Sequence, residues 1–121
     1  MRPLFDTNIL IDHLNGALQA RELIKAHPDK AICSVTWIEV MAGGAPAMDG
    51  LMRDFLADFQ IIALDDAVAE EATRLRRTRR VKLADAIVWA FARVTSRVLL
   101  TRDAKDFSAD DPGVVIPYRL P

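Results

Sequence analysis

Four carboxylates lie where the sequence pattern changes, and their types and positions indicate metal chemistry. Asp6 ends one apolar run, and Asp103 follows another. Glu39 lies among apolar neighbours, which predicts an inward-facing side chain, and Asp85 opens an apolar stretch. Carboxylate oxygens without nearby histidine or cysteine are hard ligands that suit Mg²⁺ or Mn²⁺ better than zinc. Such a metal lowers the pKa of a bound water and positions a phosphate group.

Each of these carboxylates also has a purely structural explanation. Asp6 would cap a helix, which is worth about 1 kcal/mol, and Glu39 would form a capping box with Thr36. Asp85 would place a favourable charge at a helix N-terminus, and Asp103 would form a turn after a strand. One at a time, these alternatives stay open. Together, the four carboxylates would raise one another's pKa unless a cation lies between them.

The apolar runs and their breaks predict alternating strands and helices. We expect strands at 3–5, 31–35, 60–64, 97–101 and 114–116, and helices at 7–14, 17–26, 36–42, 47–59, 66–79 and 84–95. Strands separated by helices imply a parallel α/β sheet that is covered on both faces. Sites in such sheets form beyond the carboxyl ends of the strands, where Asp6 and Asp103 are both expected.

Composition limits the class of protein. The 121 residues fit a single domain, 1–121, and 51% apolar with 27% charged residues is typical of a globular protein. A net charge of −1 means that attraction for nucleic acid must come from local clustering. The single cysteine, Cys33, cannot form an internal disulfide or a zinc site. We expect a cytoplasmic protein without a signal peptide or a membrane span.

One segment is strongly basic. Residues 74–82 contain six of the 16 basic residues and no acid. Cations at the end of a helix can be simply solvated and favoured by the helix dipole. The same run can instead contact the phosphates of a nucleic acid, in a salt-dependent way that reads little sequence. It precedes Asp85 directly, so we predict phosphate contacts near the site from Arg77, Arg79, Arg80 and Lys82.

Four short motifs, in order along the chain, resemble those of the PIN domain. They are Leu4-Phe5-Asp6-Thr7-Asn8, Thr36-x-x-Glu39, Leu83-Ala84-Asp85-Ala86-Ile87 and Thr101-Arg102-Asp103-x-x-Asp106-Phe107. More narrowly, the chain resembles a VapC-type toxin of a bacterial toxin–antitoxin pair. The resemblance covers essentially the whole chain. Each motif is weak by itself, and the ordered set carries the resemblance.

The resemblance implies a three-layer α/β/α fold with a central parallel sheet and an endoribonuclease that uses one or two Mg²⁺ or Mn²⁺ ions. Water would attack the RNA phosphate in line, leaving a 5′-phosphate and a 3′-hydroxyl. The catalytic acids would be Asp6, Glu39, Asp85 and Asp103. The metal ligands would be Asp6, Asp85, Asp103 and Asp106. Supporting positions would be Thr7, Asn8 and Thr101.

The chain departs from many PIN domains at one position. Those proteins carry Asn where this chain has Asp103. An acid is also common there, so the site is retained with more negative charge, which favours a second metal.

The resemblance also implies partners. VapC-like proteins form homodimers and are silenced by a VapB-type antitoxin that covers the active site, where an antitoxin Arg or Lys would neutralise the acids. The basic run can serve the antitoxin as well as RNA. The expected helices 17–26 and 47–59 carry surplus apolar surface, so they are candidates for the antitoxin groove and the dimer face.

Two other functions compete with the nuclease. A haloacid dehalogenase-type phosphatase also begins with a strand that ends in Asp, but it needs a second Asp two residues later, where this chain has Asn8. A catalytically inactive PIN fold would serve as an RNA- or protein-binding module. Loss of acids would mark such a module, and none of the expected acids is lost here.

Overall fold

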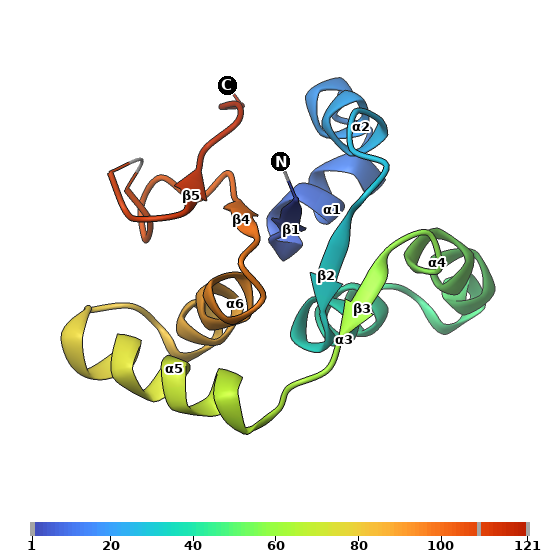
Figure 1. Ribbon diagram of the computed structural model, residues 1–121. Coiled ribbons are helices and arrows are strands. Elements are labelled where there is room, and N and C mark those ends of the chain that lie inside the picture. The colour runs from blue at the N-terminus through green and yellow to red at the C-terminus, as the bar shows by residue number, and fades with distance from the viewer. Residues whose placement is uncertain (1, 109, 121) are drawn as a thin grey trace.

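The computed structural model describes residues 2–108 and 110–120 and contains one parallel sheet of five strands. The strand order is β3-β2-β1-β4-β5 (Figure 1). The strands are β1 (Pro3–Phe5), β2 (Ala31–Cys33), β3 (Gln60–Ile62), β4 (Val98–Leu100) and β5 (Val114–Val115). Every neighbouring pair of strands is parallel, as the alternation of strands and helices predicts.

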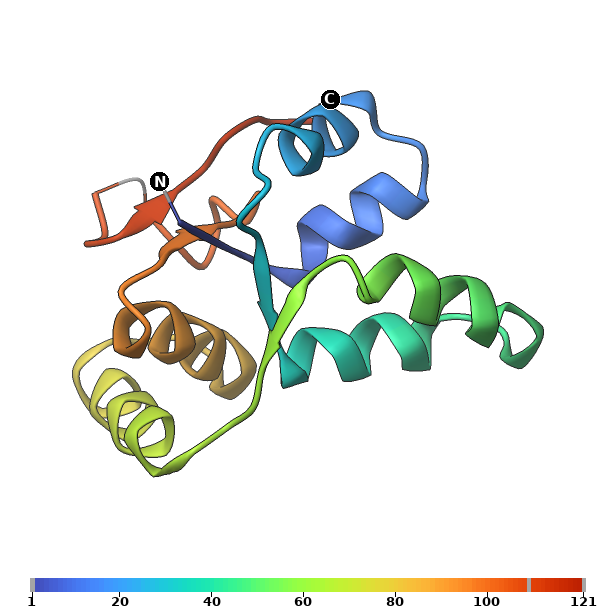
Figure 2. The ribbon, with the colours of Figure 1, turned by 45° about the vertical axis from the view of Figure 1, so that its right-hand side comes forward.

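Helices cover both faces of the sheet. They are α1 (Thr7–Leu14), α2 (Leu18–Lys25), α3 (Ser34–Gly43), α4 (Asp49–Leu56), α5 (Asp66–Thr78) and α6 (Leu83–Val94), with a 3₁₀ turn, η1 (Pro46–Met48), before α4. Helices α5 and α6 lie side by side on one face, and α1 and α2 lie on the other (Figure 2). The predicted three-layer α/β/α fold is confirmed. None of the described helices combines the length and apolar character needed to cross a membrane.

Alternation along the strands divides the core into two clusters, because successive side chains point to opposite faces of a sheet. Leu4 and Leu99 face α5 and α6, where Trp89 of α6 is fully buried. Phe5 and Leu100 face the cluster built with α1, α2 and α4. The central strands are therefore apolar on both faces, and polar groups are confined to the strand ends.

All predicted elements are present, but most bounds differ by one or two residues; β3, for example, ends at Ile62 and not at residue 64. Ser34 and Val35 belong to α3 and not to β2, so the predicted strand 31–35 is two residues too long. A short apolar run does not distinguish a strand from a buried helix by periodicity alone. The predicted helix 47–59 is too long at both ends, because a 3₁₀ turn that begins at Pro46 precedes α4, and α4 runs from Asp49 to Leu56.

The strand order places a crevice between β1 and β4. From β1 the chain continues to β2 and β3 on one side of the sheet, and later returns to add β4 and β5 on the other. Phe5 pairs with Leu100, and the next amide, that of Asp6, donates to the Leu100 carbonyl at 2.9 Å. Ligands of open parallel sheets bind at such a switch point, outside the carboxyl ends of the strands.

A buried arginine fixes the opposite end of the sheet. The side chain of Arg97 is 1% exposed. It donates to the Pro3 carbonyl at 3.1 Å, to Asp29 Oδ1 at 3.1 Å and to Gln60 Oε1 at 2.9 Å. It therefore joins β4 to the starts of β1 and β3, on the edge away from the acids.

We expect Arg97→Met to lower the free energy of unfolding by about 2 kcal/mol, because the buried Pro3 carbonyl loses its donor and the exposed Asp29 and Gln60 lose a fixed partner. Urea unfolding measures this change. Arg2→Met is the matched control, since Arg2 also contacts Asp29, at 3.2 Å, but its side chain is 58% exposed. The control should change stability by less than about 0.5 kcal/mol. Equal changes for the two variants would contradict the proposed role of Arg97.

Candidate metal centre

Asp6 lies buried between the end of β1 and the start of α1. Its Oδ1 accepts the Thr7 amide at 2.8 Å, so the predicted capping role is real. Its Oδ2 accepts the Thr101 hydroxyl at 2.8 Å, and the Asn8 amide lies 3.4 Å away. Asn8 also donates to Thr101 at 3.1 Å. The three residues predicted to support the site therefore surround the Asp6 carboxylate.

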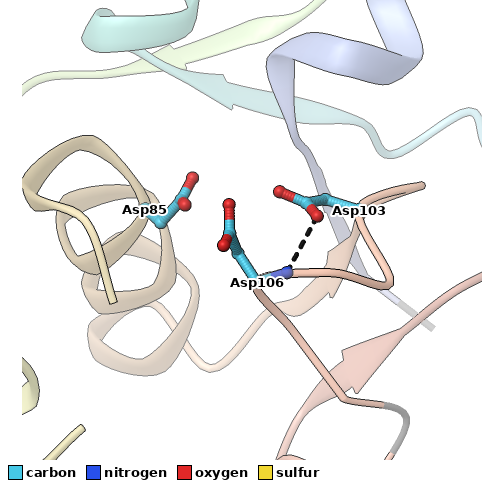
Figure 3. Close-up of side chains that lie close together, drawn as sticks. All are labelled: Asp85, Asp103 and Asp106. Carbon is cyan, nitrogen blue, oxygen red and sulfur yellow. Dashed lines mark hydrogen bonds between the residues drawn. The ribbon is translucent and has the colours of Figure 1, made fainter. Parts of the chain in front are cut away.

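The loop after β4 brings two more carboxylates to the same sheet edge. Asp103 Oδ1 accepts the backbone amides of Lys105 at 3.0 Å and Asp106 at 2.9 Å. This turn folds the chain back so that the Asp106 side chain lies beside that of Asp103 (Figure 3). The turn at Asp103, which was its structural alternative, is therefore present, and this turn brings Asp103 and Asp106 together.

Asp85 completes a cluster of three carboxylates. It lies in the first turn of α6, whose N-terminus reaches the loop after β4. One carboxylate oxygen from each of Asp85, Asp103 and Asp106 can be chosen so that all three lie within 4.8 Å of one another. Their side chains point into a shared space (Figure 3). Asp6, predicted as a fourth metal ligand, is not a member of this cluster and lies deeper, bonded to Thr101.

The cluster carries more negative charge than its surroundings neutralise. Burial, followed by the charges of Asp6, Asp106 and Asp103, raises the pKa of Asp85 to about 7. Burial also raises the pKa of Asp6, against hydrogen bonds that lower it. The only cation paired with the cluster in the described structure is Lys82, whose exposed amine lies 3.8 Å from Asp106 Oδ2. Oxygen ligands with surplus negative charge fit a hard divalent cation.

Glu39 faces the same site from α3, but it is exposed and not directed into the core. The prediction of an inward-facing side chain is wrong, because α3 begins at Ser34 and buries Thr36 and Val40 instead. The capping box that was the structural alternative for Glu39 is absent, because the N-cap of α3 is Cys33 and not Thr36. The Glu39 carboxylate accepts the Thr7 hydroxyl at 2.7 Å.

These elements enclose a cleft of about 310 Å³ at the carboxyl edge of the sheet. Its lining includes four of the predicted acids, namely Asp6, Glu39, Asp85 and Asp103. Residues from the start of α1, from α3 and α6, and from the loop after β4 thus meet in one place. The arrangement provides a cation site beside an open surface that an extended ligand can reach.

The family model of the PIN domain matches residues 4–110. The chain belongs to the PIN domain family. The match spans all four motifs that suggested the resemblance, which is therefore confirmed.

Solved structures agree with this assignment. The chain is 41% identical to a chain of a toxin–antitoxin complex from Klebsiella pneumoniae, with a TM-score of 0.93 over 98% of this chain and 99% of that chain. A chain of FitAcB from Neisseria gonorrhoeae is 22% identical, with a TM-score of 0.81 over 98% and 99%. A chain of DNA-bound VapBC from Salmonella typhimurium is 20% identical, with a TM-score of 0.80 over 94% and 95%. The last two show the fold alone. The comparison with curated proteins gives no match.

The basic run of this PIN domain covers the end of α5 and the link to α6, and its last cation, Lys82, lies 3.8 Å from Asp106 of the acidic cluster. Arg77 and Arg80 are exposed. Arg79 contacts Asp111 at 3.1 Å and lies 5.4 Å from the centre of the Trp89 ring. Lys82 contacts Asp106. Two of the four predicted RNA-binding cations are therefore already paired with acids.

The sequence predictions missed a second polar cluster in this PIN domain. Asp12 of α1 is buried and accepts two hydrogen bonds from Arg102 and one from the Tyr118 hydroxyl. Helical spacing could have indicated this buried aspartate, because Asp12 follows Ile9 by three positions and therefore lies on the apolar face of α1. A charge on a buried helix face requires a partner, although the sequence does not say which one.

Proposed function

We propose that this PIN domain is a Mg²⁺- or Mn²⁺-dependent endoribonuclease and the toxin of a VapBC-type pair. The observation that carries the proposal is the convergence of Asp85, Asp103 and Asp106 beside the buried carboxylate of Asp6. The family assignment and the 41% identity to a chain of a toxin–antitoxin complex support it.

Asp85, Asp103 and Asp106 would hold the metal, with Asp6 behind them. A bound divalent cation would neutralise these acids, activate water and stabilise charge on a phosphate. Asp6 is kept in one orientation by Thr7 and Thr101, so its carboxylate would add negative charge behind the cation without rearranging.

Glu39 would act at the open side of the cleft. Its exposed carboxylate is oriented by the Thr7 hydroxyl and is free to accept a proton from the attacking water. The water oxygen would bond to phosphorus as the bond to the 3′ oxygen breaks. The products would be a 5′-phosphate and a 3′-hydroxyl.

The basic run would guide the RNA backbone toward this cleft. Arg77 and Arg80 are exposed and available for phosphates, while Arg79 and Lys82 would exchange their acidic partners for phosphates. Such contacts position RNA without reading its sequence.

Antitoxin binding and dimer formation would use apolar surface. Leu18 of α2 and Leu51 of α4 are each 62% exposed, and Ile38 of α3 is 58% exposed. Helices α3 and α4 pack together, and exposed apolar side chains that lie together mark protein interfaces. Helices α2 and α4, which correspond to the predicted helices 17–26 and 47–59, therefore remain our candidates for these contacts.

RNA-end mapping tests the nuclease proposal. Purified protein is incubated with total RNA and Mg²⁺, Mn²⁺ or EDTA, and the new ends are sequenced. We expect discrete cleavage with either metal, 5′-phosphate ends and no cleavage in EDTA. Cleavage in EDTA would contradict the metal-dependent mechanism. RNA binding without cleavage under every condition would favour the inactive binding module.

A further inference from the structure

Arg102 is the one cation among the described residues that line the metal-site cleft. It lies between Thr101, which bonds Asp6, and Asp103, which belongs to the acidic cluster. Its backbone amide donates to Asn8 Oδ1 at 3.1 Å. The main chain at Arg102 is therefore fixed relative to the proposed metal ligands on both sides.

The Arg102 side chain is fixed as well. Its Nη2 donates to Asp12 Oδ1 at 2.8 Å, and its Nε donates to Asp12 Oδ2. The Tyr118 hydroxyl donates to the same Oδ2 at 2.7 Å. The Asp12 side chain is 6% exposed, whereas that of Arg102 is 35% exposed. A buried carboxylate thus holds a guanidinium whose other side reaches solvent.

This pairing leaves donors free on Arg102. A guanidinium carries five N–H groups, and Asp12 accepts two of them. No other acceptor for the Arg102 side chain occurs in residues 2–108 and 110–120. Planar, fixed donors of this kind bind phosphate oxygens well, with little conformational entropy left to lose.

An ion pair with a purely structural role would not need to lie at the metal-site cleft. Arg93 and Glu71 form a pair at the far end of α6, at 2.6 Å, away from the acids. Arg102 instead lines the metal-site cleft, and its guanidinium is held by the buried Asp12. An arginine at the edge of an acidic cleft can hold an anionic ligand that the acids would otherwise repel.

We propose that Arg102, held by Asp12 and Tyr118, binds a backbone phosphate of the RNA next to the scissile one. The proposal rests on the proposed nuclease function of the same cleft. Arg102 would contact substrate directly. Asp12 and Tyr118 would be positioning residues that act through it.

RNA binding tests the proposal without relying on cleavage. Fluorescence anisotropy of a short labelled random-sequence RNA pool with Ca²⁺ gives Kd at several salt concentrations. Arg102→Met alone would leave a buried carboxylate unpaired, so the principal variant is Asp12→Asn with Arg102→Met. We expect Kd to rise about tenfold, and the slope of log Kd against log salt to fall by about 0.7, the value for one lost phosphate contact.

Two further variants separate charge from geometry. Arg102→Lys keeps the charge but lacks the planar fork, so it should retain the salt slope while Kd rises by a few fold. Glu71→Gln with Arg93→Met removes the remote ion pair and should change neither quantity.

These measurements distinguish failure of the proposed role of Arg102 from failure of the proposed nuclease function. An unchanged Kd and salt slope in the Asp12→Asn, Arg102→Met protein, with only a lower melting temperature, would overturn the role of Arg102. So would the absence of RNA binding by the wild type. RNA binding with the expected losses, but without cleavage when Mg²⁺ replaces Ca²⁺, would support this role and count against the nuclease.

Discussion

Replacing Asp6 with Asn is expected to lower the rate of RNA cleavage by about a thousandfold or more while leaving the protein folded. The Asp6 carboxylate is buried next to the acidic cluster, so its charge bears on any cation held there. Asn has the same shape, and its oxygen can still accept the Thr7 amide. Loss of the Thr101 hydrogen bond costs about 1 kcal/mol, which removal of an unfavourable buried charge offsets.

Initial cleavage rates and melting temperatures measure the two effects. Asp65→Asn is the matched control, because Asp65 caps α5 and its Oδ1 accepts the Val68 amide at 2.9 Å. This variant changes the same groups at a helix start away from the cleft, so cleavage should be unchanged. Cleavage by Asp6→Asn within tenfold of wild type would remove Asp6 from the catalytic set.

The second large effect concerns Asp85, for which stability and activity should move in opposite directions. In the metal-free protein its pKa is about 7, against 3.8 when unfolded. The folded state therefore holds a proton that the unfolded state has lost, so stability falls as pH rises from about 4 to 7. The full shift corresponds to about 4 kcal/mol, which partial exposure of the carboxylate reduces to about 2 kcal/mol.

Asp85→Asn should therefore stabilise the protein by about 2 kcal/mol in EDTA at pH 8, with the gain vanishing toward pH 4. The same change removes a proposed metal ligand, so cleavage should fall about a hundredfold. Urea unfolding across pH and initial rates measure the two effects. Asp66→Asn is the control, because it removes an acid from the first turn of another helix, α5. It should slightly lower stability and leave the cleavage rate unchanged. A destabilised or fully active Asp85→Asn protein would contradict the proposal.

The sequence predicted the architecture well because its strands are short, apolar and separated by amphipathic helices. β1 and α1 match their predicted bounds. The errors lie where local pattern is ambiguous. Val35 is apolar and β-branched, yet it belongs to α3 because the chain turns into a helix directly after Cys33. Because α3 begins at Ser34, the Glu39 side chain is exposed and does not face the core.

The site was predictable where a motif follows a strand directly. Asp6 and Asp103 lie at the carboxyl ends of neighbouring parallel strands, so topology brings them together. The Asp12–Arg102 pair was not predictable, because these residues are 90 positions apart and only the tertiary fold places one against the other. Asp106, which the resemblance placed among the metal ligands, lies in one cluster with Asp85 and Asp103.

The most direct test of the metal centre is the dependence of the RNA cleavage rate on Mn²⁺ concentration. Wild type is compared with single Asn variants at Asp85, Asp103 and Asp106, and with Asp65→Asn as control. We predict saturable activation of the wild type and the control, and a higher half-saturating concentration in each cluster variant. Cleavage independent of Mn²⁺, or the same half-saturating concentration in all five proteins, would contradict the metal centre.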